Sequence, residues 1–149
     1  MIEFVPFRVD HLDRIDVQPA QAHSLPLLRR ADLRAWMQES EPAETALVDG
    51  VPVACAGIHV HEPGVGRAWG YLSGAIPRGE WVRLTRRVAG ALAASPLALI
   101  MGTVLDGFVA GHRWCRLLGL APGGTQEIEG RLYWIYERRL AAGALRGGV

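Results

Sequence analysis

The pattern of apolar and polar positions predicts a strand followed by helices in the N-terminal part of the chain. The stretch 2–8 begins with alternating apolar and polar residues and is expected to form a strand, whose side chains point to opposite faces in turn. Asp10 can then cap a short helix that extends through Ile15. Apolar positions recur three or four apart over 24–39, which is the spacing of one helix face. Pro26 interrupts this stretch, and Glu41-Pro42 ends it because a residue before proline avoids the helical region.

A β-hairpin is the clearest local prediction in the middle of the chain. Strands over 46–48 and 51–60 flank Asp49-Gly50, a dipeptide that suits a two-residue type I′ turn. A second turn over 62–66 leads into a strand over 67–73. We therefore expect three consecutive antiparallel strands at the centre of the domain.

The second half of the chain predicts two further helices and three strands. The stronger helix covers 80–94, where apolar residues three or four apart form a stripe. Another helix over 108–118 ends at Gly119, a residue that suits a left-handed helix cap. Strands are expected over 97–103, 125–128 and 131–137. The resulting order, β-α-α-β-β-β-α-β-α-β-β, predicts a mixed α/β domain.

Length and composition predict a single soluble domain over 1–140 with a loose tail over 141–149. Half of the 149 residues are hydrophobic, which is enough for an ordinary core. The net charge of +1 does not support a nucleic-acid partner. No apolar run reaches the about 18 residues of a membrane span, and the N-terminus lacks a signal-peptide pattern. We therefore expect a cytoplasmic protein with no membrane partner.

Few side chains are candidates for acid–base chemistry. His59 and His61 lie two apart in a strand and share one face, and Glu62 follows them. His61 or Glu62 can serve as a general base, or these residues form the solvated rim of the sheet. No metal site is expected, because the histidine pair has no third ligand in sequence reach. Cys55 and Cys115 lie far apart and predict neither a disulfide framework nor a zinc site.

The stretch Phe108–Leu120, which reads FVAGHRWCRLLGL, carries a resemblance to a known family. A helix ending in Leu-Gly-Leu, followed by a turn and the strand 131–137, resembles the last third of the GCN5-related N-acetyltransferase (GNAT) fold. The resemblance implies a central, mostly antiparallel sheet of about six to seven strands flanked by about four helices. The family usually carries N-x-x-A-x-x-x-Y-x-x-x-G-F here. The positions that differ in this chain are Phe108, Gly111, Cys115 and Leu120.

The same resemblance implies a site for acetyl-CoA. In the family, backbone groups at the end of the fourth strand hold the pantetheine arm. A glycine-rich loop at the start of the next helix holds the pyrophosphate, because free N–H groups and the helix dipole favour an anion. The matching segment here covers 72–81. Its cofactor-binding candidates are Leu72, Ser73, Gly74, Arg78, Gly79, Glu80 and Trp81.

Two departures from the family pattern leave alternatives open. The loop has one glycine at the turn instead of a pair, and Glu80 and Trp81 add negative charge and bulk. Glu80 therefore belongs either to a phosphate site or to an ordinary acidic helix start. Cys115 takes the place of the tyrosine that often protonates the departing CoA thiolate. A thiol can donate that proton, but the position also lies on the helix's apolar stripe, where a cysteine packs as a small hydrophobe.

Two functions follow from these observations. One is an active acetyl-CoA-dependent N-acyltransferase whose acceptor is a small-molecule or peptide amine. The other is a non-catalytic protein, favoured by the degenerate loop and by Cys115. The segment AGHRWCRLLGL also resembles phage-encoded GNAT-like proteins, among them small internal virion proteins. That resemblance implies a structural or assembly role in the virion, with other virion proteins as partners.

Overall fold

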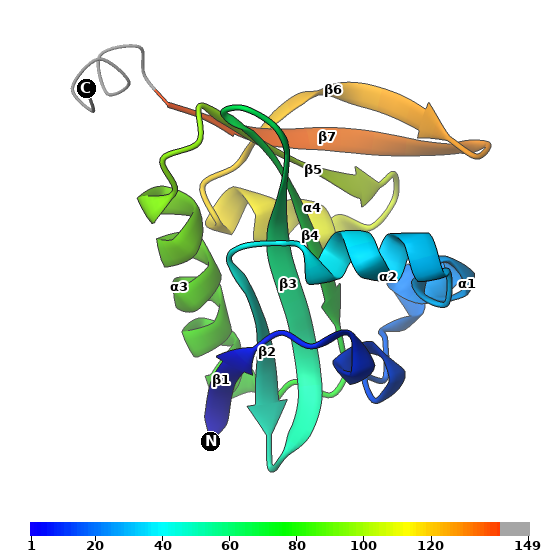
Figure 1. Cartoon of the computed structure of the whole chain (residues 1–149), viewed down its shortest axis with the longest axis vertical. Coiled ribbons are helices and arrows are strands. Elements are labelled where there is room, and N and C mark those ends of the chain that lie inside the picture. Colours follow the sequence, from blue (N-terminus) through cyan, green and yellow to red (C-terminus); the bar gives the residue numbers. More distant parts are fainter. Residues whose placement is uncertain (141–149) are drawn as a thin grey trace. The chain divides into compact units, whose positions relative to one another are not determined.

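The computed structural model describes residues 1–140 and confirms the expected mixed α/β fold. Seven strands form one sheet in the order β1-β2-β3-β4-β5-β7-β6 (Figure 1). The β4–β5 pair is parallel, whereas β1–β2, β2–β3, β5–β7 and β6–β7 are antiparallel. The strands are β1 (Ile2–Pro6), β2 (Ala43–Val48), β3 (Val51–Glu62), β4 (Val65–Leu72), β5 (Leu99–Leu105), β6 (Ala121–Ile128) and β7 (Arg131–Arg139).

Four α-helices and two 3-10 helices connect these strands within the described part of the chain. The 3-10 helices are η1 (Val9–Asp13) and η2 (Pro19–Ser24). The α-helices are α1 (Leu25–Leu28), α2 (Ala31–Gln38), α3 (Arg78–Ala94) and α4 (Val109–Leu117). The expected start of the third helix at Glu80 is wrong by two residues. Arg78 and Gly79 belong to its first turn, where Pro77 precedes them with φ preset for a helix start.

The chain divides into two compact units. The first unit contains Met1–His59 and Ala68–Leu84, and the second contains Val60–Arg67 and the chain from Thr85 onward. The expectation of a single domain over 1–140 stays a prediction. The expected loose tail over 141–149 lies outside the described residues.

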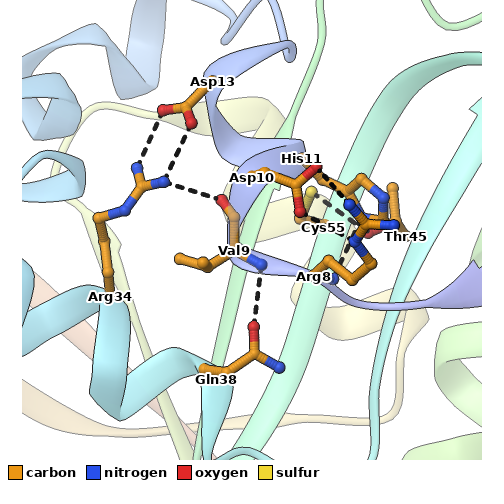
Figure 2. Close-up of polar contacts among 9 residues, drawn as sticks. All are labelled: Arg8, Val9, Asp10, His11, Asp13, Arg34, Gln38, Thr45 and Cys55. Carbon is orange, nitrogen blue, oxygen red and sulfur yellow. Dashed lines mark hydrogen bonds and ion pairs between the residues drawn. The ribbon is translucent and has the colours of Figure 1, made fainter.

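The first unit is built on the predicted hairpin and the helices before it. β2 and β3 meet at Asp49 and Gly50, whose φ values of 51° and 76° are those of a type I′ turn (Figure 1). Polar contacts tie η1 to α2, and Figure 2 shows Arg34 of α2 directed at Asp13 of η1. The buried cluster consists of Phe7, Leu12, Ile15, Leu28, Met37 and Cys55.

The second unit is organised around β7. β7 pairs with β5 along Leu99–Leu105 and with β6 on its other edge. β4 and β5 pair in parallel over Val65–Arg67 and Leu99–Met101. Ile100 and Tyr136, on β5 and β7, are both 0% exposed. These two side chains therefore mark the interior of this unit.

Candidate functional site

The candidate cofactor segment lies entirely in the first unit, where β4 ends and α3 begins. Leu72 and Ser73 are buried, and Gly74 is exposed. The Ser73 N–H donates to the Val53 carbonyl at 2.8 Å, which fixes the end of β4 against β3. The Ser73 Oγ accepts the Ala75 N–H at 3.1 Å. The turn into α3 is therefore held by the serine rather than by a second glycine.

The first turn of α3 leaves backbone donors unpaired. The N–H groups of Glu80 and Trp81 both donate to the Pro77 carbonyl, at 2.9 and 3.2 Å. Within residues 1–140, the N–H groups of Arg78 and Gly79 form no hydrogen bond. A Cβ built on Gly79 would meet nothing within 4 Å. Unpaired N–H groups at the positive end of a helix dipole favour an anion.

Glu80 opposes an anion at this turn. One carboxylate oxygen, Oε2, is buried and has no hydrogen-bond partner among the described residues. A carboxylate in the first turn interacts favourably with the helix dipole, and it repels a second negative charge. Arg78, two residues earlier in the chain, is exposed and carries a positive charge. The turn therefore combines two free donors, one cation and one anion.

The edge of β4 carries two residues that the sequence did not single out. Gln21 of η2 bonds through its side chain to the backbone of Gly70 and Leu72, at 2.8 and 3.0 Å. The N–H of Gln18 donates to the Leu72 carbonyl at 2.8 Å. Gln21 and Gly70 are 49 positions apart, so no local sequence pattern could have indicated this contact.

The histidine candidates differ in their surroundings. His61 and Glu62, at the end of β3 in the second unit, are exposed, and Nε2 lies 3.7 Å from Oε1. His59, in the first unit, has a side chain only 12% exposed. It stacks on Trp36 with ring centroids 4.3 Å apart, and its Nδ1 is buried without a hydrogen-bond partner among the described residues. His61 is therefore open to solvent, whereas His59 is packed.

Cys115 lies on α4 in the second unit and is partly buried. Burial raises the pKa of its thiol to about 11, because desolvation disfavours the thiolate. An ordinary cysteine thiol has a pKa of about 8.5. Cys115 is thus a weaker acid than a free thiol. Cys55 in the other unit behaves alike, with a pKa raised to about 11 by burial.

A polar pair in the second unit joins the partly buried His112 of α4 to the buried Tyr136 of β7. The Nε2 of His112 lies 3.1 Å from the Leu105 carbonyl, an acceptor only, so Nε2 carries the proton. The Nδ1 of His112 then accepts from the Tyr136 hydroxyl at 2.7 Å. Tyr136 is fully buried. This pair satisfies hydrogen-bonding groups of both side chains.

Two classes of site are not found in the described part of the chain. Residues 1–140 contain no group of three or more His, Cys, Asp or Glu side chains that could hold a metal ion. No helix among those residues has the length and apolar character needed to cross a membrane.

Comparisons with known proteins identify the fold. No protein-family model and no curated protein matches the sequence. Among solved structures, an N-acetyltransferase from Staphylococcus aureus Mu50 has a TM-score of 0.66 at 12% identity, covering 95% of this chain and 99% of its own. A GNAT-family acetyltransferase from Streptococcus pneumoniae has a TM-score of 0.64 at 13% identity, covering 95% of this chain and 100% of its own.

A third similar structure contains a ligand. It is yncA from Salmonella typhimurium, classed as an acetyltransferase and solved with its cofactor acetyl-CoA. Its TM-score is 0.64 at 12% identity, and the match covers 95% of each chain. The fold of this chain is therefore that of GNAT acetyltransferases. The resemblance to phage virion proteins stays a prediction.

Proposed function

We propose that this chain is an N-acyltransferase of the GNAT type that binds acetyl-CoA at the end of β4 and the first turn of α3. The observation that carries the proposal is the pair of unpaired N–H groups of Arg78 and Gly79 at the start of a 17-residue helix. The shared fold and the acetyl-CoA in one similar structure support it.

Each candidate has a distinct role in this proposal. The N–H groups of Arg78 and Gly79 donate to pyrophosphate oxygens, and the absent Cβ of Gly79 lets the phosphate approach. The Arg78 guanidinium adds a charge-assisted contact. Leu72 supplies backbone groups for the pantetheine arm, and Ser73, Gly74 and Trp81 shape the turn. Glu80 weakens the site without abolishing it.

The reaction transfers the acetyl group to an amine on a small molecule or a peptide. The amine nitrogen attacks the thioester carbonyl, the carbon–sulfur bond breaks, and the amine proton passes to a base. His61 and Glu62, both exposed in the second unit, remain the candidates for this base. Proton transfer from Cys115 to an ordinary thiolate is uphill, because its pKa is raised to about 11. We therefore expect the thiolate to take its proton from solvent or from the base that has received the amine proton.

Opposite charge changes in the first turn of α3 test the phosphate site. Arg78→Ala is expected to weaken acetyl-CoA binding, and Glu80→Gln to strengthen it, each by about two- to fivefold, as for other charges at a helix N-terminus. Titration calorimetry at low salt measures both. Arg86→Ala, a matched loss of an exposed arginine on α3, should leave the affinity unchanged. Equal affinities in all four proteins would place the phosphates elsewhere.

A non-catalytic role in virion assembly is the second candidate. Two observations favour a non-catalytic role, because both work against acetyl transfer. The pKa of Cys115 is raised, and the Gln21 side chain already bonds to the backbone of Gly70 and Leu72 at the end of β4. This role predicts no heat with acetyl-CoA at millimolar concentration. It also predicts that the protein sediments with assembled particles when it is expressed with the genes that flank it. Measurable acetyl-CoA binding with turnover of an amine would exclude it.

A further inference from the structure

The hydrogen bonds of β4 show which of its backbone groups point away from β3, toward the other edge of the strand. Ser73 directs its N–H to β3, so odd-numbered positions near the end of β4 face that strand. Just before β4, the Gly64 carbonyl accepts the Leu99 N–H from β5. Even-numbered positions therefore face the other edge. The carbonyl of Gly70 and both backbone groups of Leu72 lie on this edge.

The segment Val17–Gln21 occupies that edge. The Gln21 Nε2 donates to the Gly70 carbonyl at 2.8 Å, and its Oε1 accepts the Leu72 N–H at 3.0 Å. The Gln18 N–H donates to the Leu72 carbonyl at 2.8 Å. Val17 and Ser73 form an isolated antiparallel bridge. All of these residues belong to the first unit.

A carboxamide that bonds in this way reproduces the pairing of a strand. It donates to one carbonyl and accepts from the N–H two residues later, as the N–H and C=O of one residue on a neighbouring parallel strand do. Gln18 fixes the orientation of this amide, because its own Nε2 donates to the Gln21 Oε1 at 3.1 Å. The pantetheine arm also carries secondary amides, and it would need the same groups of Gly70 and Leu72.

We propose that Val17–Gln21 is a built-in occupant of the acyl-CoA site, so that the free protein is self-occluded. This proposal rests on the proposed function, because it takes the end of β4 as the place of the pantetheine arm. Acyl-CoA binds there only when the Gln21 amide leaves the strand edge. Ligand binding and release of the Val17–Gln21 segment are therefore one coupled step.

Two variants weaken the occupant in different ways. Gln21→Ala removes both side-chain bonds to β4. Gln18→Pro removes the N–H that donates to the Leu72 carbonyl, and the φ of −58° at Gln18 suits proline. Each variant should bind acetyl-CoA about tenfold more tightly than the wild type, the effect of removing one to two hydrogen bonds that compete with the ligand. Gln126→Ala, on the exposed strand β6, is the matched control.

Calorimetry and amide hydrogen exchange together separate the outcomes. Tighter binding in both variants, with faster exchange of the Leu72 amide before ligand and slow exchange after it, supports self-occlusion. Acetyl-CoA binding that is measurable in the two variants but not in the wild type also supports self-occlusion. Equal affinity in the wild type and both variants overturns self-occlusion and leaves the proposed function standing. No binding in any protein overturns the proposed function, and self-occlusion with it.

Discussion

Phe108 and Gly111 depart from the GNAT pattern together, and the packing of α4 explains why. A Cβ built on Gly111 would lie 2.6 Å from Cδ2 of Phe108 and 3.0 Å from Cγ1 of Val104. The phenyl ring therefore fills the volume that an alanine methyl group would need. Phenylalanine in place of asparagine and glycine in place of alanine are thus one packing change. They carry no independent information about lost chemistry.

Tyr136 and His112 give a testable energetic coupling at the residue scale. Tyr136→Phe removes the hydroxyl that donates to the His112 Nδ1 and leaves that partly buried acceptor unpaired. We expect the free energy of unfolding in urea to fall by about 1–3 kcal/mol. In a His112→Leu background the same substitution should have a much smaller effect, since no acceptor remains. Additive effects of the two substitutions would show that the hydroxyl and the imidazole are not coupled.

At the scale of elements, Arg34 joins three helical segments. It donates to both carboxylate oxygens of Asp13 in η1 at 3.0 Å. It also donates to the Val9 carbonyl in η1 at 3.3 Å (Figure 2) and to the Leu28 carbonyl in α1 at 3.1 Å. Its side chain is 22% exposed. A planar guanidinium can make these bonds together, and a lysine ammonium cannot reproduce the fork.

Arg34→Lys should therefore lower the free energy of unfolding by about 1 kcal/mol, although it keeps the charge. The matched control is Arg8→Lys, because Arg8 also pairs in a forked manner with an aspartate, Asp10. Arg8 is 70% exposed, however, and its partner is only two residues away. The control should change stability little. An equal decrease in the free energy of unfolding of the two variants, measured by urea denaturation, would show that the contacts of Arg34 with η1 and α1 add no stability beyond that of an exposed ion pair.

The sequence predicted those elements whose formation depends on residues close together in the chain. The hairpin followed from Asp49-Gly50, and the long helix from its apolar stripe. The helix start was misplaced, because Gly79 was taken for a loop residue, although it lies in the first turn of α3. The candidate loop could be found from its position in the element order. Its occupant at Gln21 could not, because that contact depends on tertiary folding.

At the scale of the whole chain, the order of elements was a better guide to the fold than the identity of residues. The three similar structures described above share only 12–13% of their residues with this chain. Alternation and helical spacing survive such divergence because they require only that a position stay apolar. Side-chain chemistry does not survive it in the same way, as the position of Cys115 illustrates. The fold was therefore predictable, whereas the activity needs the experiments on Arg78 and Gln21.

His11 makes the stability of the protein depend on pH. Its side chain is buried, and its Nδ1 accepts the Arg8 N–H at 3.2 Å and lies 2.7 Å from the Thr45 Oγ1 (Figure 2). Burial lowers the pKa of His11 below its usual 6.5, because desolvation disfavours the imidazolium. The unfolded chain therefore binds a proton at a higher pH than the folded protein does. Stability contributed by neutral His11 is complete above about pH 6.5 and is lost as the pH falls toward the folded pKa.

Urea denaturation between pH 7.5 and 5 measures this loss directly, with conditions chosen around the usual histidine pKa of about 6.5. One proton can change the free energy of unfolding by at most about 1.4 kcal/mol per pH unit. His11→Asn keeps an acceptor near the position of Nδ1 and cannot titrate. The variant should be less stable than the wild type at neutral pH, and the difference should shrink as the pH falls. The other histidines are present in both proteins, so the change in this difference belongs to His11. A constant difference over the whole range would mean that protonation of His11 does not affect folding.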